Sequence, residues 1–248
     1  MQKEMSGINR NSWNKDRYQA WLNKFGSIEQ EAQRIISDPR KRLKILADYL
    51  GDIREKRVIN LLGSNGTKAI SVALMGAKEV MVVDIAEENA RFGYDLAGAC
   101  NVKIDYIVTD IMDLAPEELG EFDIVFFEMG VLHYIYDINK LFEIAYRLLS
   151  KGGRFVLREY HPVIWKLLKP ENGRYVASGN YFDQSVIGEE MKVRRWNLGE
   201  VVTAIINAGF TIKALHEESG QIKQWVFKDM PEGTEDKVPG IYAVIASK

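Results

Sequence analysis

The sequence is poor in cysteine and in long apolar runs. Its single cysteine, Cys100, excludes an internal disulfide, which is typical of proteins from a reducing compartment. Cys100 follows a run of small residues without a cationic neighbour, so we expect a buried structural thiol. No apolar run approaches the ~20 residues that cross a bilayer, and the first ten residues lack the apolar core of a signal peptide. We therefore expect a cytoplasmic protein that has no membrane partner.

An excess of basic charge is also missing. The 248 residues carry a formal net charge of −2, whereas nucleic-acid-binding domains usually show a basic excess or stripe. The short basic clusters at 40–44 and 192–195 stand among acidic residues, and we interpret them as solvated faces. The three histidines and the scattered carboxylates show no metal-ligand spacing. We expect neither a nucleic-acid partner nor a bound metal.

Residues 12–50 have the pattern of an N-terminal helical segment. Trp13, Arg17, Trp21 and Phe25 recur at a spacing of four, which puts three aromatic rings on one helical face. Two interpretations remain open for this segment. It either packs against the main domain as a structural element or covers a bound ligand as a lid.

From residue 58 onward, short apolar runs alternate with amphipathic segments. Runs such as 80–83 and 124–127 contain no polar residue, as expected for parallel strands that are buried on both faces. The alternation predicts an α/β fold with a doubly wound, mostly parallel sheet and helices on both faces. The expected strands are 58–62, 79–83, 103–108, 122–128, 153–159, 210–216 and 240–247, and the expected helices are 66–76, 87–99, 137–150 and 198–208.

The segment 162–198 interrupts this alternation. It combines prolines and glycines with five aromatic residues, which is too aromatic for a disordered linker. We expect an ordered insertion on the substrate side of the sheet, and a surface loop that includes 231–236 before the last strand. The chain is then one domain with four parts: a helical cap (12–50), a cofactor-binding core (55–160), the insertion (162–198) and a C-terminal helix with terminal strands (198–248).

Polar residues follow four of the expected strands, at the sheet edge where ligands of open α/β folds bind. The turn 63–66 follows the first strand, Asp84 the second, Asp110 the third and Glu128 the fourth. A glycine-bearing turn that opens a helix lets backbone N–H groups approach a ligand, and an acidic residue after the next strand can bind ribose hydroxyls. The interval from Gly66 to Asp84 is 84 − 66 = 18 residues, close to the ~20 residues typical of nucleotide sites. The pattern predicts a ligand that contains adenosine.

Two segments are more specific for a protein family than this nucleotide-binding pattern, namely FDIVFFEMGVLHYIYD (122–137) and LLSKGGRFVLREYHP (148–162). Together with INLLGSNG (59–66), VVDIAEENARFG (82–93), TDIMDL (109–114) and the tail 194–218, they resemble class I S-adenosylmethionine-dependent methyltransferases of the small-molecule type. The resemblance covers about residues 55 to 248. It implies a Rossmann-like seven-stranded sheet with an antiparallel C-terminal strand and an N-terminal helical cap.

The resemblance also implies S-adenosyl-L-methionine as cofactor and methyl transfer to a small-molecule acceptor by in-line displacement. Asp84 would bind the ribose hydroxyls, Asp110 would reach the adenine amino group, and His133 would border the transferred methyl. The full set of implied cofactor contacts is Asn60, Gly63, Ser64, Asn65, Gly66, Asp84, Ile85, Asp110, Ile111, Glu128, Met129 and Leu132.

The glycine turn departs from the family's acidic-x-Gly-x-Gly-x-Gly pattern. Asn60 stands at the acidic position, and Leu62 and Ser64 stand where glycines are common. We expect Gly63 to restore the flexibility of the turn one residue along. The contact to the cofactor's amino group is the part of the site that the resemblance defines least.

A general base is required only if the acceptor must lose a proton. His133 and His161 are the candidates because both follow expected strand ends, and the alternative for each is a hydrogen-bonded structural histidine. Two other functions stay open. The chain could be a non-catalytic sensor or partner subunit that binds S-adenosylmethionine or S-adenosylhomocysteine, or an NAD(P)-dependent oxidoreductase, although the G-x-G-x-x-G spacing of the latter is missing.

Overall fold

The computed structural model describes residues 1–219 and 237–248. The surface loop expected at 231–236 lies outside the described residues. In chain order the elements are α1 (Gln2–Asn14), α2 (Arg17–Phe25), α3 (Ile28–Ser37), α4 (Pro39–Leu43), α5 (Leu46–Leu50), β1 (Arg57–Leu61), α6 (Thr67–Leu74), β2 (Glu79–Asp84), α7 (Glu87–Ala99), β3 (Asp105–Val108), η1 (Ile111–Asp113), α8 (Pro116–Leu119), β4 (Phe122–Glu128), η2 (Leu132–Tyr134), α9 (Ile138–Leu148), β5 (Leu149–Tyr160), η3 (Val163–Leu167), β6 (Leu168–Glu171), β7 (Arg174–Ala177), β8 (Val186–Ile187), β9 (Val193–Arg194), α10 (Leu198–Asn207), β10 (Thr211–Ser219) and β11 (Pro239–Ser247).

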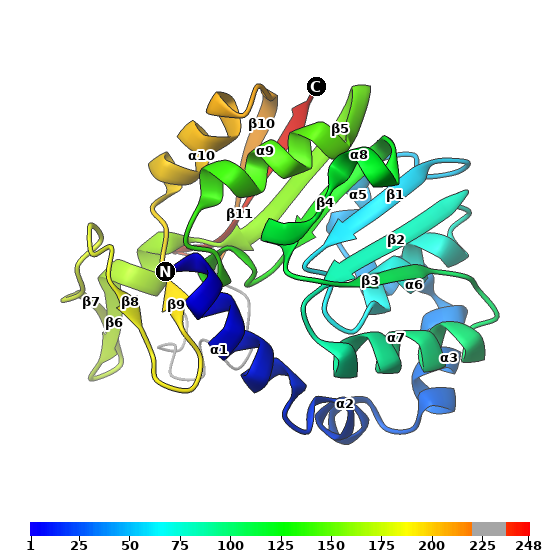
Figure 1. The fold of residues 1–248 in the computed structure, drawn as a ribbon. Coiled ribbons are helices and arrows are strands. Elements are labelled where there is room, and N and C mark those ends of the chain that lie inside the picture. The colour runs from blue at the N-terminus through cyan, green and yellow to red at the C-terminus, as the bar shows by residue number, and fades with distance from the viewer. Residues whose placement is uncertain (220–236) are drawn as a thin grey trace.

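A seven-stranded sheet in the order β10-β11-β5-β4-β1-β2-β3 organises the molecule (Figure 1). The strands β3, β2, β1, β4 and β5 pair in parallel. Strand β11 runs antiparallel to both of its neighbours, β5 and β10. The expected doubly wound, mostly parallel sheet with an antiparallel C-terminal strand is confirmed.

Neighbouring residues of the central strands face two separate cores, one on each side of the sheet. Phe127 packs in the core that α9 and α10 cover, whereas Phe126 packs in the core that α3 to α7 cover. Both rings are fully buried, and burial of one such side chain stabilises the fold by roughly 1.5–3 kcal/mol. This two-sided burial explains why the run 124–127 contains no polar residue. Cys100 is buried in the second core, as expected.

The N-terminal segment is helical from Gln2 rather than from residue 12, and the single helical face expected for its aromatic residues was wrong. Asp16 adopts a left-handed φ of 53°, which ends α1 and lets α2 start in a new direction. Trp13 therefore lies on α1, and Trp21 lies on α2. The guanidinium of Arg17 connects the two helices because it lies 4.3 Å from the Trp13 ring centroid and 6.0 Å from that of Trp21.

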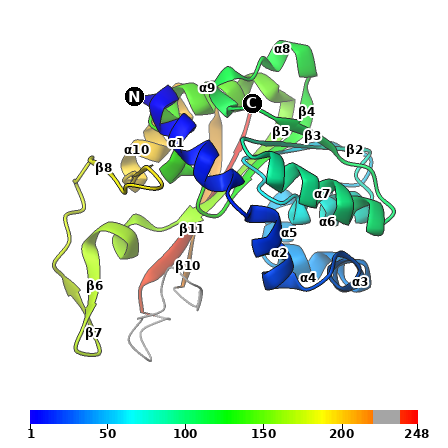
Figure 2. The same ribbon diagram turned by 60° about the horizontal axis from the view of Figure 1, so that its bottom comes forward.

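The insertion contains two small hairpins, β6–β7 and β8–β9, beyond the end of β5. In Figure 2, β6 and β7 project away from the main sheet. The end of the insertion returns to the main domain, where the Trp196 indole donates a hydrogen bond to the Ile135 carbonyl at 3.0 Å. No helix in the described part of the chain is both long and apolar enough to cross a bilayer.

Candidate functional site

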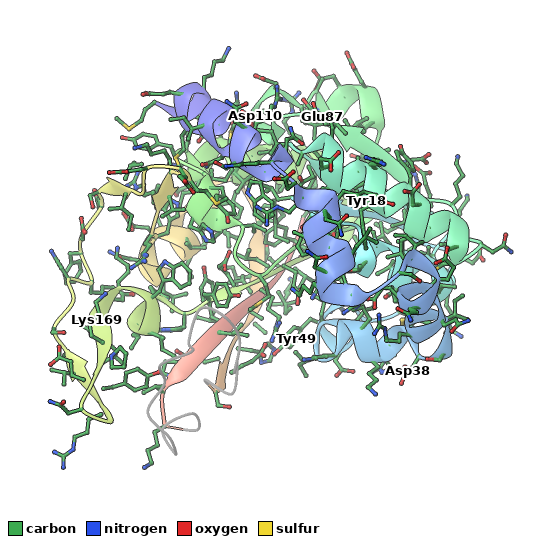
Figure 3. All side chains as sticks on the ribbon, turned by 90° about the horizontal axis from the view of Figure 1, so that it is seen from below. Tyr18, Asp38, Tyr49, Glu87, Asp110 and Lys169 are labelled. Carbon is green, nitrogen blue, oxygen red and sulfur yellow. The ribbon has the colours of Figure 1, made fainter. Side chains whose placement is uncertain are left out.

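A cavity of about 830 Å³ lies at the carboxyl ends of strands β1, β2 and β4 and extends to residues that follow β3. This volume suits a cofactor-sized ligand. One side of the cavity, which we call the strand-end wall, is formed by residues at the ends of these strands and just beyond them. The other side, the cap wall, is formed by α1, α2 and residues 42–45. Figure 3 shows α1 and α2 following each other across the near side of the molecule, with Lys169 of the β6–β7 hairpin far from Asp38, which caps α4.

The cavity brings together most of the site residues predicted from the sequence. His133, Asn60, Gly63, Ser64, Asn65, Asp84, Ile85, Asp110, Ile111, Glu128 and Met129 line it. Gly66, Leu132 and His161 do not occur among the described lining residues. Gly66 caps α6 directly behind the turn with a φ of 72°, and Leu132 is buried in the core beside α9.

The turn after β1 retains left-handed backbone conformations without the usual glycines. Leu62 and Ser64 have φ values of 49° and 50°, a region that costs a non-glycine residue roughly 1–2 kcal/mol. Gly63 does not use its conformational freedom, so our expectation for it was wrong. It is required for packing, because a Cβ at this position would approach Val82 Cγ1 to 2.6 Å and Asn60 Oδ1 to 2.8 Å.

The carboxylate of Asp84 is fixed by hydrogen bonds at the edge of the cavity. Its Oδ2 accepts from the Ser64 backbone N–H at 2.9 Å, and its Oδ1 accepts from the Ala86 N–H at 3.1 Å and from Asn89 Nδ2 at 3.0 Å. Burial raises the pKa of Asp84 above its usual value, and these donors oppose that rise. The donors fill about three of the four lone-pair positions of a carboxylate, so Oδ2 retains capacity for a hydroxyl donor in the cavity.

Asp110 lies beyond β3 and caps the short helix η1. Its Oδ1 accepts from the Met112 backbone N–H at 3.0 Å. Asp110 is 7% exposed and lines the cavity together with Ile111. A carboxylate next to an apolar side chain can bind the amino edge of a base while the base plane packs on the apolar group.

Four charged residues that line the cavity form an ionic network that the sequence did not predict. Arg158 binds Glu128 at 3.0 Å and Glu218 at 2.5 Å, and Lys68 forms an ion pair with Glu128. Burial lowers the pKa of Lys68, and the cations around it, Arg158 first, lower it further. Additional positive charge comes from Arg42, which also lines the cavity.

The interpretation of 40–44 as a solvated face was wrong for Arg42. Its side chain is 28% exposed, pairs with the buried carboxylate of Glu31, and lies over the Phe25 ring at 5.0 Å. Lys24 and Lys44 line the same part of the cavity. Mutual repulsion of these cations favours an anionic group between them.

The loop after β4 is held by a buried carboxylate from β5. Glu159 accepts hydrogen bonds from the consecutive N–H groups of Gly130, Val131 and Leu132, at 2.6, 2.8 and 3.0 Å. Met129, with a φ of 61°, begins this loop. Burial raises the pKa of Glu159, and the backbone donors oppose the rise. Glu159 therefore fixes the loop that carries Met129 and His133 into the cavity and is not available there as a base.

The structure separates the two predicted histidines. His133 lines the cavity, and burial together with Arg195 lowers its pKa to about 3. His161 is 4% exposed, accepts a hydrogen bond from the Val163 N–H at 3.2 Å, and lies 3.0 Å from Glu217. Burial lowers the pKa of His161, although Glu217 opposes this.

Aromatic side chains surround His133. Its ring centroid lies 4.1 Å from that of Tyr134 and 5.5 Å from that of Trp165, and Trp165 stacks on Tyr160 at 5.2 Å. Trp13 of α1 meets Tyr134 edge-on at 5.7 Å. His133, Tyr134, Tyr160 and Trp13 all line the cavity. Within residues 1–219 and 237–248, no group of three or more His, Cys, Asp or Glu side chains is arranged to hold a metal ion.

Residues 62–157, which include Gly63, Asp84, Asp110 and Glu128, match the family model of a methyltransferase domain. The chain carries a methyltransferase domain. The resemblance to class I S-adenosylmethionine-dependent methyltransferases that the sequence predicted is confirmed by this match.

Curated relatives resemble this methyltransferase domain at moderate identity. The chain is 29% identical over 147 residues to a ubiquinone biosynthesis O-methyltransferase of Xanthomonas oryzae pv. oryzae. This alignment covers 56% of this chain and 60% of the relative. It is 26% identical over 155 residues to the protein of the same name from Bordetella parapertussis, covering 62% and 63%. The chain thus spans less than two thirds of the length of these relatives.

Solved structures share the fold of the methyltransferase domain. An S-adenosylmethionine-dependent methyltransferase from Mesorhizobium loti superposes with a TM-score of 0.67 at 21% identity, covering 90% of this chain and 99% of that one. Magnesium protoporphyrin IX methyltransferase from Synechocystis PCC 6803, solved with bound S-adenosylmethionine, superposes with a TM-score of 0.62 at 14% identity, covering 98% and 96%. At these identities the neighbours establish the fold alone.

Proposed function

We propose that the chain is an S-adenosylmethionine-dependent methyltransferase that acts on a small-molecule acceptor. The observation that carries the proposal is a single cavity that holds the fixed carboxylate of Asp84, the turn 63–65 and the aromatic surroundings of His133. The names of the curated relatives and the ligands of the solved neighbours support the same activity.

The residues of the cavity fit the cofactor from end to end. Asp84 would hold the ribose, and Asp110 with Ile111 would hold the adenine. The carboxylate and the amino group of the methionine part are both charged at neutral pH. The cations Lys68 and Arg42 suit the carboxylate, and Glu128 suits the amino group. Glu128 thus offers the acidic contact that Asn60 does not supply.

When bound, S-adenosylmethionine supplies a methyl group that its sulfonium has already activated. The protein then needs mainly to align donor and acceptor and to exclude water. Met129 and His133 lie on the loop that Glu159 fixes, so we assign them to the methyl-transfer end of the cavity. Trp13 and Tyr134 would pack against the acceptor.

We propose that His133 orients the acceptor rather than removing its proton. A group with a pKa of about 3 is a weak base at neutral pH, whereas an efficient general base has a pKa near the operating pH. Its neutral imidazole can accept one hydrogen bond from a hydroxyl or amine acceptor. His161 lies outside the described lining residues, and we assign it no direct contact with the acceptor.

The acceptor is best described as a small molecule with an apolar or aromatic body and a nucleophilic oxygen, nitrogen or carbon. The aromatic side chains around His133 support the apolar body. The O-methyltransferase names of the curated relatives favour oxygen as the methyl acceptor.

Calorimetry with S-adenosylmethionine, S-adenosylhomocysteine and NADH tests the ligand class, and a panel of phenols, amines and carboxylic acids with radiolabelled methyl donor tests the activity. We expect heat with the first two ligands and labelled product with at least one acceptor. Heat with NADH alone contradicts the proposal. Binding of S-adenosylhomocysteine without turnover on any acceptor favours the non-catalytic sensor.

A further inference from the structure

A chain of hydrogen bonds connects the N-terminal cap to the carboxylate at the end of β2. The indole N–H of Trp21, on α2, donates to Asn89 Oδ1 at 2.9 Å, and Asn89 Nδ2 donates to Asp84 Oδ1 at 3.0 Å. Asn89 lies in the first turns of α7, which follows β2 directly. It is 1% exposed, so water does not compete for either bond.

The three side chains can form this series of hydrogen bonds in one order only. An indole N–H can only donate, and an ionised carboxylate can only accept. The residue between them must therefore accept on one side and donate on the other, which the amide of Asn89 does. Neither an acidic nor an apolar side chain at position 89 would make both bonds.

Trp21 also belongs to the cap wall of the cavity. Its ring stacks on Phe25 at 5.8 Å and lies 6.5 Å from Phe92 of α7. One face of the side chain is thus fixed by packing, while its N–H is committed to Asn89. The position of α2 over the cavity and the position of the Asp84 carboxylate are consequently set by the same group.

Other contacts attach the cap to α7 without touching Asp84. The hydroxyl of Tyr18 donates to Asp95 at 2.6 Å, and the backbone N–H of Tyr18 donates to Glu88 at 3.2 Å. Figure 3 shows Tyr18 on α2 next to α7. These bonds join the same two helices as Trp21 does, so they provide a comparison for any effect that comes from docking alone.

We propose that Trp21 and Asn89 are positioning residues for the ribose of the cofactor, acting through Asp84. The inference rests on the proposed function, because it takes the cavity ligand to be S-adenosylmethionine. Asn89 holds Oδ1 of Asp84, so that Oδ2 of Asp84 stays turned to the cavity for a ribose hydroxyl. By linkage, ribose binding and the docking of α2 strengthen each other to the same extent. The cap is therefore part of the cofactor site, which joins the two interpretations of a packed helix and a lid.

The test compares S-adenosylhomocysteine with its 2′-deoxy and 3′-deoxy analogues by calorimetry. In the wild type, removal of the hydroxyl that binds Asp84 should weaken affinity on the order of tenfold or more, as for a lost hydrogen bond to a charged group. Trp21→Phe keeps the ring but removes the N–H, and Asn89→Ala removes the amide. Both should lower affinity for S-adenosylhomocysteine by about three- to tenfold and should shrink the wild-type discrimination against the deoxy analogue by a similar factor.

Tyr18→Phe is the matched control, because it removes a hydrogen bond between the same helices and leaves Asp84 untouched. It should retain the wild-type discrimination against both deoxy analogues. The inference is overturned if Trp21→Phe and Asn89→Ala discriminate against the deoxy analogues as strongly as the wild type does. It is also overturned if Tyr18→Phe loses the discrimination equally, since docking alone would then explain the effect.

Two further outcomes keep the inference separate from the proposed function. If wild-type protein binds no S-adenosylhomocysteine, the proposed function fails before the variants are compared. If Asn89→Ala does not fold, Trp21→Phe carries the test, and hydrogen exchange of the Trp21 indole N–H in the wild type supplies a second readout. That exchange should slow several-fold on addition of S-adenosylhomocysteine, and an unchanged rate contradicts the coupling.

Discussion

The two walls of the cavity are built by different kinds of contact. In the strand-end wall, Asp84, Asp110 and the turn 63–66 are held mainly by backbone groups that lie close to them in sequence or on the neighbouring strand. In the cap wall, the side chains are held by partners far away in sequence. Asn9 of α1, for example, exchanges hydrogen bonds with the backbone of Lys192, at 2.7 and 2.8 Å.

This difference indicates a division of labour. A wall fixed by backbone groups suits a cofactor that is the same in every member of the family, because its geometry depends little on individual side chains. A wall fixed by side chains can change with few substitutions and suits the acceptor, apart from Arg42, which we assign to the carboxylate of the cofactor. The Trp21–Asn89–Asp84 chain is the place where the two walls meet.

The largest effect is expected from Asp84→Asn, which keeps the size of the side chain but removes the charge from the strand-end wall. Affinity for S-adenosylhomocysteine should fall on the order of a hundredfold, because hydrogen bonds to a charged group contribute about 1.5–3 kcal/mol. Lys24→Gln, in the cap wall, should change the same affinity less than about fivefold. Titration calorimetry measures both. Equal losses in the two variants would remove the distinction between the walls.

The next largest effect is expected at Glu159, which fixes the loop between the walls. Glu159→Gln turns an amide N–H₂ toward backbone N–H donors, and a buried unsatisfied group costs about 1–3 kcal/mol. Urea unfolding should show a loss of that size, and the rate of methyl transfer should fall more than the affinity for S-adenosylhomocysteine. Glu143→Gln, a substitution on the exposed side of α9, is the control and should change neither value. A stable, fully active Glu159→Gln protein would contradict the role of this carboxylate.

The third prediction concerns pH and sharpens the role of His133. Its pKa is lowered from 6.5 to about 3 in the folded protein, so between these values the unfolded chain binds the extra proton and the folded protein does not. Stability should therefore fall as pH drops below about 6.5, by at most about 1.4 kcal/mol per pH unit from this group. His133→Gln should flatten that part of the urea-midpoint profile. An identical pH slope in the variant and the wild type would show that His133 does not resist protonation.

The smallest effect is expected in the turn after β1. Ser64→Gly removes the cost of a left-handed side-chain-bearing residue, but it also adds freedom to the unfolded chain. The balance should raise the free energy of unfolding by about 0.5–1 kcal/mol. Ser64→Ala keeps the strain and should bring no such gain. If the alanine variant is stabilised as much as the glycine variant, the serine is not strained.

The strand-end wall was predictable from sequence because its determinants are local. Apolar runs define the strands, and the residues that follow them must meet at one edge of a parallel sheet. Asp84, Asp110 and Glu128 were found in this way. The conformations of Leu62 and Ser64 were not, because neither residue type signals a positive φ and the required turn is imposed by packing around Gly63.

The cap wall was predictable only in part. The aromatic spacing of Trp13 and Trp21 indicated a helical segment that faces something apolar, but no glycine or proline marked the break at Asp16. The bond from Trp21 to Asn89 joins residues 68 positions apart and depends on how α2 packs on α7. The low pKa of His133 depends likewise on its burial and on the nearby positive charge of Arg195, which the sequence does not reveal.

A crystal structure of the protein with S-adenosylhomocysteine tests the central claim most directly. The account predicts the ribose on Asp84, the adenine beside Asp110 and Ile111, and the sulfur facing the loop that carries Met129 and His133. Trp21 and Asn89 should keep their contacts behind the ribose. A ligand that binds outside this cavity, or a cavity that stays empty at saturating S-adenosylhomocysteine, would contradict the account.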